Sequence, residues 1–412
     1  MKRLHLVHNG TRIGQLLQDQ GGTMRLTAPP VDGIARLSLA FAPSETPIRP
    51  RLARAYVEGL LPEGDQVRGA TARRFGVSAQ SPFALLSAIG HDCPGAVQFL
   101  SDEQLETGPE GELVPIPDHR IARRLRDLRL NPAAAWIAEG EHWSLGGAQS
   151  KFALRWESGR WHEAHGMQAT THILKPGIIG LSSQALTEHI SLRALELVGL
   201  NVAHSCFTRF EGEAAIVIER FDRILDDGVM YRVHQEDMCQ ATSSLPNAKY
   251  TVEALQIVTT LRRAGTPEAE VIEFVRAVLA NWVLGAPDAH AKNYSVILGP
   301  DGLVSLAPLY DVSTGLGLGD YPALAMGIGG EKDFKKITGR HVLEFVRSLG
   351  VDDGTAIPTA ATMALLMPAA FEAAMLELEH DIDDAELEQL QRVQSKLAGH
   401  CQHILTALER TG

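Results

Sequence analysis

The segment DAHAKN, from Asp288 to Asn293, carries residue types that phosphoryl transfer requires. It follows an apolar stretch at residues 268–284 with helical spacing. That helix should stop before Pro287, because proline disfavours helical geometry in the residue preceding it. The Asp288 carboxylate can orient an attacking hydroxyl and accept its proton, while the Asn293 side-chain oxygen can hold magnesium. A loop whose Asp and Asn side chains only cap backbone amides is the alternative that this segment leaves open.

A second carboxylate, Asp311, ends the apolar segment SLAPLYD. It lies near the end of a predicted hairpin at residues 294–313, which turns at the Gly-Pro-Asp-Gly sequence of residues 299–302. Kinases place a magnesium-binding carboxylate in this position, and magnesium prefers hard oxygen ligands, with phosphate oxygens completing its shell. A turn-forming aspartate without a ligand is the alternative for Asp311.

The glycine-rich segment SLGGAQSK, residues 144–151, is the candidate phosphate loop. Gly146 and Gly147 lack side chains, so backbone amides there can approach phosphate oxygens closely. The segment does not fit the Walker pattern of nucleotide-binding loops. A Gly-Gly hairpin turn is therefore the competing interpretation.

Two further segments have the composition of a nucleotide site. Lys175 ends the apolar strand THILK, from which a lysine can reach phosphates, and Glu188 lies early in the next predicted helix, where it could pair with that lysine. Phe221 follows the strand AAIVIE and could form an apolar wall beside an adenine. The alternatives are a solvated strand end, a solvated helix face and an ordinary core phenylalanine.

The elements that must position these residues form an α+β pattern. Short strands are expected in residues 1–50 and helices in 50–90, and a polar, Pro- and Gly-rich stretch at 101–118 is the first predicted domain boundary. Strands then return between Trp143 and Glu219, interrupted by one helix at about 183–198. Further helices are predicted at 251–264, 268–284, 359–379 and 384–409. The predicted divisions are 1–110, 111–250 and 251–412, with a cleft between two lobes.

Composition and charge exclude several other classes of protein. With 38 Lys plus Arg against 50 Asp plus Glu, the net charge of -12 argues against a chain that grips nucleic acid with its whole surface. The arginine-rich stretch at 120–129 is interpreted as a solvated helix face, with contact to an acidic partner as the alternative. No run of about 18 apolar residues and no signal-peptide core is present, so no membrane span and a cytoplasmic location are expected.

Other kinds of site lack their patterns. The four cysteines form no Cys-x-x-Cys pair, and the histidine pairs at 162/165 and 400/403 lack a matching third ligand, so neither a zinc site nor a disulfide framework is expected. The sequence also contains no Gly-x-Ser-x-Gly elbow and no dinucleotide-binding Gly-x-Gly-x-x-Gly after a strand.

Six motifs in order, SLGGAQSK, THILKP, ERFDR, HQEDMCQ, APDAHAKNYS and APLYDVS, resemble the HipA family of bacterial serine/threonine kinase toxins. The N-terminal run GLLPEGDQVRG…SPFALLSAIGHDCPGAVQF resembles that family's N-terminal subdomain, and the similarity covers about residues 55–330. It implies a two-lobed protein-kinase-like fold. The strand-rich N-terminal lobe would carry an extra N-terminal subdomain, and the C-terminal lobe would be mainly helical.

The resemblance also implies roles for individual residues, with ATP and Mg²⁺ as cofactors. Asp288 would be the catalytic base, Asn293 and Asp311 the metal ligands, Ser144 the autophosphorylated serine whose modification ejects the loop, and Glu188 the partner of the ATP lysine. The residues expected to contact ATP are Leu145, Gly146, Gly147, Ala148, Gln149, Ser150, Lys151, Lys175, Glu219, Arg220, Phe221, His290 and Lys292. Pro287 and Ser150 depart from the family pattern, and Ser150 is a candidate second phosphorylation site.

The family's substrates are aminoacyl-tRNA synthetases, notably the glutamyl enzyme, and its partner is a small helix-turn-helix antitoxin that binds operator DNA. The resemblance therefore implies a growth-arresting kinase that contacts DNA indirectly. Two alternatives stay open: a catalytically weak kinase fold that acts mainly as corepressor with its antitoxin, and a small-molecule kinase with the same ATP site. The retained Asp288, Asn293, Asp311 and Lys175 argue against the first.

Overall fold

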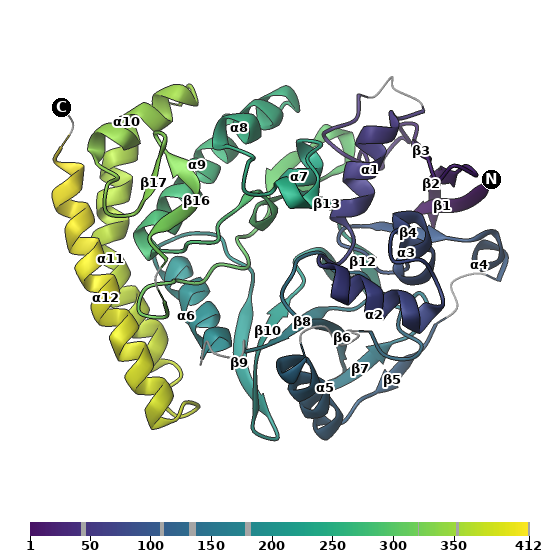
Figure 1. Ribbon diagram of the computed structural model, residues 1–412, viewed down its shortest axis with the longest axis horizontal. Coiled ribbons are helices and arrows are strands. Elements are labelled where there is room, and N and C mark those ends of the chain that lie inside the picture. Colours follow the sequence, from purple (N-terminus) through teal and green to yellow (C-terminus); the bar gives the residue numbers. More distant parts are fainter. Residues whose placement is uncertain are drawn as a thin grey trace.

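The chain folds around two hydrophobic cores, one in each lobe. The computed structural model describes all of residues 1–412 except 43–46, 108–110, 132–136, 178–182, 320, 352–353 and 411–412. One core joins the N-terminal strands to the central sheet, and the other fills the helical C-terminal lobe. The N-terminal strands and the last two helices lie at opposite ends of the molecule (Figure 1).

A small N-terminal subdomain comes first. Its sheet has the strand order β3-β2-β1-β4, with β1 at Lys2–His8, β2 at Thr11–Gln18, β3 at Met24–Thr27 and β4 at Val97–Leu100. Helices α1 (Pro50–Gly59), α2 (Asp65–Phe75) and α3 (Pro82–Ile89) pack beside it. Gly76 caps α2 with a left-handed conformation, and Gly90 caps α3, so helices occupy residues 50–90 as predicted.

The central sheet runs antiparallel in the order β5-β7-β6-β8-β10-β9. Alternate residues of β10 face opposite sides, so Ala215 and Val217 join the N-terminal core, whereas Ile216 and Ile218 join the C-terminal core with α6. Helix α5 contacts the strands β8, β9 and β10 from the N-terminal core. The bounds are β5 Leu113–Pro115, α5 Asp118–Leu130, β6 Phe152–Glu157, β7 Arg160–Ala164, β8 His172–Pro176, α6 Gln184–Leu197, β9 Ser205–Phe210 and β10 Glu213–Glu219.

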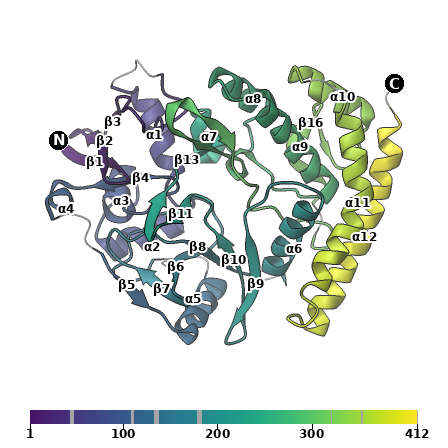
Figure 2. The same cartoon turned by 180° about the vertical axis from the view of Figure 1, so that it is seen from behind.

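The C-terminal lobe is mainly helical and carries the predicted hairpin. β14 and β15 form that hairpin, and β14 also pairs with β13. A second hairpin, β11–β12, follows strand β10 of the central sheet along the chain (Figure 2). The bounds are β11 Arg223–Asp226, β12 Val229–Arg232, β13 Gln235–Asp237, α7 Met238–Ala241, α8 Ala254–Arg263, α9 Glu268–Leu284, β14 Ser295–Leu298, β15 Val304–Leu306, β16 Ala323–Ile328, β17 Glu331–Asp333, α10 Gly339–Ser348, α11 Ala356–Leu376 and α12 Asp384–Leu408.

Helix α11 differs from the expectation that no stretch could cross a membrane. By length and composition it is apolar enough to do so. In the structure it packs against α6, α9 and α12, and its Met363, Met367 and Phe371 side chains are buried. Its apolar residues thus contribute to the core of the C-terminal lobe.

The stretch predicted as a boundary, residues 101–118, holds more structure than its composition indicates. It contains helix α4 (Asp102–Thr107), which packs near β1, and strand β5, which pairs with β7 of the central sheet. The Asp102 carboxylate accepts hydrogen bonds from Arg3 and His5 at 2.6 and 2.7 Å. Helix α4 therefore packs on the subdomain, and strand β5 belongs to the central sheet.

Candidate functional site

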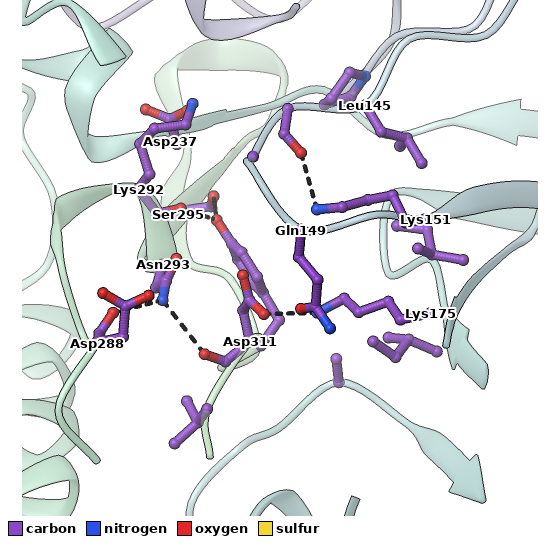
Figure 3. Close-up of a pocket in the computed structure, with 18 of the residues that line it drawn as sticks. Leu145, Gln149, Lys151, Lys175, Asp237, Asp288, Lys292, Asn293, Ser295 and Asp311 are labelled. Carbon is purple, nitrogen blue, oxygen red and sulfur yellow. Dashed lines mark hydrogen bonds and ion pairs between the residues drawn. The ribbon is translucent and has the colours of Figure 1, made fainter. Parts of the chain in front are cut away.

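A cavity of about 330 Å³ lies between the two lobes, and Figure 3 shows the side chains that enter it. Ser144 and Ser150 are buried beside this cavity. The structure brings together around the cavity most residues that the sequence singled out: Leu145, Gly146, Gly147, Ala148, Gln149, Lys151, Lys175, Glu188, Glu219, Arg220, Phe221, Asp288, His290, Lys292, Asn293 and Asp311.

The loop after α9 presents Asp288 to the mouth of the cavity. Helix α9 ends as predicted, since Gly285 adopts the left-handed conformation (φ 67°) that terminates a helix. The Asp288 side chain is 67% exposed, so its carboxylate can meet an incoming hydroxyl. The Asn293 side-chain amide donates to the Asp288 carbonyl oxygen at 2.8 Å and to the Asp311 carbonyl oxygen at 3.3 Å. Asn293 thereby fastens the two acidic segments to each other.

Asp311 and Lys175 form the electrostatic centre of the cavity. The Lys175 ammonium lies 2.6 Å from Asp311 Oδ1 and 2.7 Å from Glu188 Oε1. Burial acts to raise the pKa of Asp311, but the ammonium groups of Lys175 and Lys151 outweigh it and hold that pKa well below the usual range. Burial acts to lower the pKa of Lys175, yet its two carboxylate partners raise it. Both groups therefore stay charged.

The backbone at Asp311 is also unusual. Its φ of 57° lies in the left-handed region, which costs a non-glycine residue energy and is tolerated best by Asp and Asn. The turn directs the carboxylate toward Lys175 while the carbonyl oxygen accepts from Asn293. The strain is thus located at the residue whose carboxylate the sequence assigns to metal binding.

The candidate phosphate loop, residues 144–151, is held by the N-terminal subdomain. Ser144 Oγ donates to the Leu60 carbonyl oxygen at 2.6 Å, and the Glu63 N–H donates to the Gly147 carbonyl oxygen at 3.0 Å. Gly147 has a φ of 96° and lies against Lys151, whose ammonium donates to the Gly146 carbonyl oxygen at 3.0 Å. Burial, followed by repulsion from Lys175, lowers the pKa of Lys151 to about 8.

The segment after β10 closes the other side of the cavity. The Phe221 ring packs near that of Tyr310, with centroids 5.8 Å apart. Arg220 lines the cavity, but its buried guanidinium forms ion pairs with Asp92 at 3.1 Å and Asp222 at 2.9 Å. That guanidinium is thus occupied in linking the segment to the N-terminal subdomain.

His290 and Lys292 both face inward from the loop after α9. The Lys292 ammonium donates to the Asp237 carboxylate and, at 3.3 Å, to the Gly59 carbonyl oxygen. The His290 ring lies 4.0 Å from Asp288 Oδ2, and burial lowers its pKa. Lys292 thereby connects the C-terminal lobe with helix α1.

Three residues at this site were not selected from the sequence. Tyr250 donates from its hydroxyl to Asp288 Oδ1 at 2.7 Å, Asp237 holds Lys292, and Glu63 forms an ion pair with Lys249 at 2.9 Å. Asp237 lies in the HQEDMCQ motif, which contributed to the family resemblance, but no residue of that motif was assigned a role. Tyr250 and Glu63 carried no such signal, because nothing in their local sequence shows that the fold brings Glu63 to the cavity and Tyr250 to Asp288.

Comparison with known proteins identifies the family. The model of the HipA N-terminal domain matches residues 4–100, and that of the HipA-like C-terminal domain matches residues 143–375. The chain belongs to the HipA family. It is 36% identical over 341 residues to a putative kinase, Y4mE, of Sinorhizobium fredii, covering 79% of this chain and 80% of the relative.

A relative that bears the HipA name and a solved HipA structure agree with this assignment. The serine/threonine-protein kinase toxin HipA of Shewanella oneidensis is 28% identical over 368 residues, covering 85% of this chain and 83% of the relative. The HipA chain from the complex of Shewanella HipA, HipB and operator DNA superposes with a TM-score of 0.86 at 25% identity and 99% coverage of both chains. The expected two-lobed kinase-like α+β fold and the class of serine/threonine protein kinase are confirmed.

Proposed function

We propose that this HipA-family chain transfers the γ-phosphoryl group of ATP to a protein serine and thereby arrests growth as the toxin of a toxin–antitoxin pair. The observation that carries the proposal is the meeting of Asp288, Asn293 and Asp311 around one cavity opposite Lys175. These residues come from distant parts of the sequence, and together they offer a base, oxygen ligands and a fixed cation.

The geometry supports a task for each group in the proposed transfer. The exposed Asp288 carboxylate accepts the proton of the attacking serine hydroxyl. Lys175, which Glu188 and Asp311 hold in place, and Lys151 in the phosphate loop attract the negative phosphates. The Phe221 ring supplies an apolar face for the adenine.

The donor set also suits magnesium. Both Asn293 hydrogen bonds use the amide nitrogen, so the amide oxygen can serve as a ligand beside the Asp311 carboxylate. Held by these two residues, magnesium would neutralise negative charge on the phosphates. Among the described residues no three His, Cys, Asp or Glu side chains gather as a metal site, so phosphate oxygens would complete the shell.

Ser144 suits an inhibitory autophosphorylation site. Its side chain is fully buried and its hydroxyl donates to Leu60, which leaves no room for a phosphate. Transfer to Ser144 requires the phosphate loop to leave the N-terminal subdomain. The added charge of up to about -2 then prevents the loop from returning to a place where ATP phosphates bind.

For the substrate we propose an aminoacyl-tRNA synthetase such as the glutamyl enzyme, and for the partner a helix-turn-helix antitoxin that carries the contact with operator DNA. The Shewanella relative was solved together with HipB and operator DNA, which supports the partner. A net charge of -12 favours indirect DNA contact. The proposed location is the cytoplasm, where such substrates occur.

The deciding experiment compares Asp288→Asn with Asp301→Asn, a change at an exposed aspartate in the β14–β15 turn. Removing the base should lower ³²P incorporation from labelled ATP by about 10²-fold or more, while ATP affinity stays at the wild-type value. Phosphoproteomics of cells expressing wild type or Asp288→Asn would then identify the substrate. Equal growth arrest by wild type and by Asp288→Asn would contradict the kinase mechanism.

A further inference from the structure

The Asp288 carboxylate is held by a side chain from outside its own loop. Tyr250, 38 residues earlier, donates its hydroxyl to Asp288 Oδ1 at 2.7 Å. The Asp288 side chain is 67% exposed, so without the hydrogen bond from Tyr250 it would be free to change rotamer in water. A base that must meet a serine hydroxyl at hydrogen-bond distance gains from being fixed.

Tyr250 is itself fixed by its surroundings. Its ring packs edge-on against His290, with centroids 5.0 Å apart and an interplanar angle of 80°. The preceding residue, Lys249, accepts a backbone hydrogen bond from Ala291 and forms an ion pair with Glu63. The tyrosine is therefore attached to the catalytic loop by ring packing and to the N-terminal subdomain through its neighbour.

The two carboxylate oxygens of Asp288 have different surroundings. Oδ1 accepts from Tyr250, whereas Oδ2 lies 4.0 Å from the His290 ring nitrogen, beyond hydrogen-bond distance. Partial burial and the bond to Asp288 raise the pKa of Tyr250, so its hydroxyl stays a donor at neutral pH. One oxygen is thus occupied, and the other remains to accept a proton.

We infer that Tyr250 is a positioning residue of the phosphoryl transfer, whose hydroxyl holds Asp288 Oδ1 so that Oδ2 faces the acceptor serine. This inference rests on the proposed role of Asp288 as base. It assigns Tyr250 to the acceptor step and not to ATP binding, because the described residues that line the cavity with Lys175 and Lys151 do not include Tyr250.

The test uses Tyr250→Phe, which keeps the ring on His290 and removes only the hydroxyl, with Tyr231→Phe in the exposed β11–β12 hairpin as matched control. Single-turnover ³²P incorporation into the full chain is measured against ATP concentration, together with Tm. For Tyr250→Phe the maximal rate should fall about tenfold, since a hydrogen bond to a charged group is lost. The half-saturating ATP concentration and Tm should stay at wild-type values, and Tyr231→Phe should match wild type throughout.

Each other outcome has a definite meaning. An unchanged or increased rate for Tyr250→Phe would overturn the inference, and an increase would show that the hydroxyl competes with the acceptor serine. A fall accompanied by an equal fall in Tyr231→Phe, or by a lower Tm, would assign the effect to stability and likewise overturn it. Failure of wild type to incorporate phosphate would instead refute the proposed function.

Discussion

Lys151 and Lys175 lie in the same cavity, yet their surroundings shift the two pKa values in opposite directions. Lys175 has two carboxylate partners at 2.6 and 2.7 Å, and its pKa is raised. Among the described residues, Lys151 donates to the neutral carbonyl oxygen of Gly146, and burial and the nearby Lys175 lower its pKa to about 8. Lys151 is therefore the cation whose charge changes within the working range of pH.

This difference predicts a pH dependence of ATP binding. Below pH 8 the Lys151 ammonium is charged and attracts phosphate, whereas above pH 8 it loses its proton, so affinity should fall by up to about tenfold per pH unit. Calorimetry near pH 8 in buffers of different ionisation enthalpy should detect proton uptake on binding. Lys151→Arg, which stays charged, should bind without that uptake. Equal binding by wild type at pH 7 and 9.5 would contradict the assignment.

At the scale of elements, the phosphate loop depends on a glycine in a position that other residues tolerate poorly. Gly147 has a φ of 96°, and a Cβ there would lie 2.8 Å from Lys151 Nζ. A side chain at this position would therefore displace the ammonium from the loop, in addition to straining the backbone.

Gly147→Ala should accordingly raise the KM for ATP by about tenfold, because moving the Lys151 ammonium away from the phosphates would forfeit about 1.5 kcal/mol of a hydrogen bond to a charged group. Gly159→Ala is the matched control, because Gly159 has a φ of 76° in the β6–β7 turn and nothing within 4 Å of its added Cβ. Both variants carry backbone strain, but only the first should alter ATP kinetics. Equal KM values for the two would show that the loop does not contact ATP.

Local pattern predicted most elements around the site. The apolar spacing of residues 268–284 predicted α9 at its observed bounds, and the strand that carries Lys175 also lies where it was predicted. The predicted hairpin is present, but its second strand, β15, ends at Leu306 and does not extend to Asp311. Strands β16 and β17 were missed, since they are short and lack alternation. The arginine-rich helix α5 was identified, but its partners were not: Arg124 pairs with Glu141, and Arg126 and Arg129 share Glu213.

What the sequence could not reveal are contacts made by the tertiary fold. Asp92 of the N-terminal subdomain is fully buried among the guanidinium groups of Arg220, Arg223 and Arg232, and burial, which acts to raise its pKa, is outweighed by these cations. Nothing in the local sequence of Asp92 indicates this cluster. The same holds for Tyr250, whose partner Asp288 lies on another loop.

At the scale of the whole molecule, the cavity lies between two lobes, each of which has its own hydrophobic core. The phosphate loop and Lys175 extend from the side of the N-terminal core, while Asp288, Asn293 and Asp311 extend from the C-terminal lobe. A ligand that contacts both sides should stabilise the molecule as a unit, because it binds the closed, folded arrangement and not the unfolded chain. Such stabilisation depends on the groups that link metal and phosphate to each lobe.

Mg-ATP at about 100 times its Kd should therefore stabilise wild type by about 2.7 kcal/mol and raise its Tm. Asp311→Asn should lose most of that shift, and so should wild type in EDTA, because both remove the metal that joins the phosphates to the C-terminal lobe. Asp301→Asn is a close control, since Asp301 also has a φ of 57° and lies exposed in the β14–β15 turn. Differential scanning calorimetry of the three proteins with and without Mg-ATP measures the shift. If Asp311→Asn and Asp301→Asn gain the same Tm from Mg-ATP, Asp311 is not a metal ligand, and the site would have to hold ATP through its lysines alone.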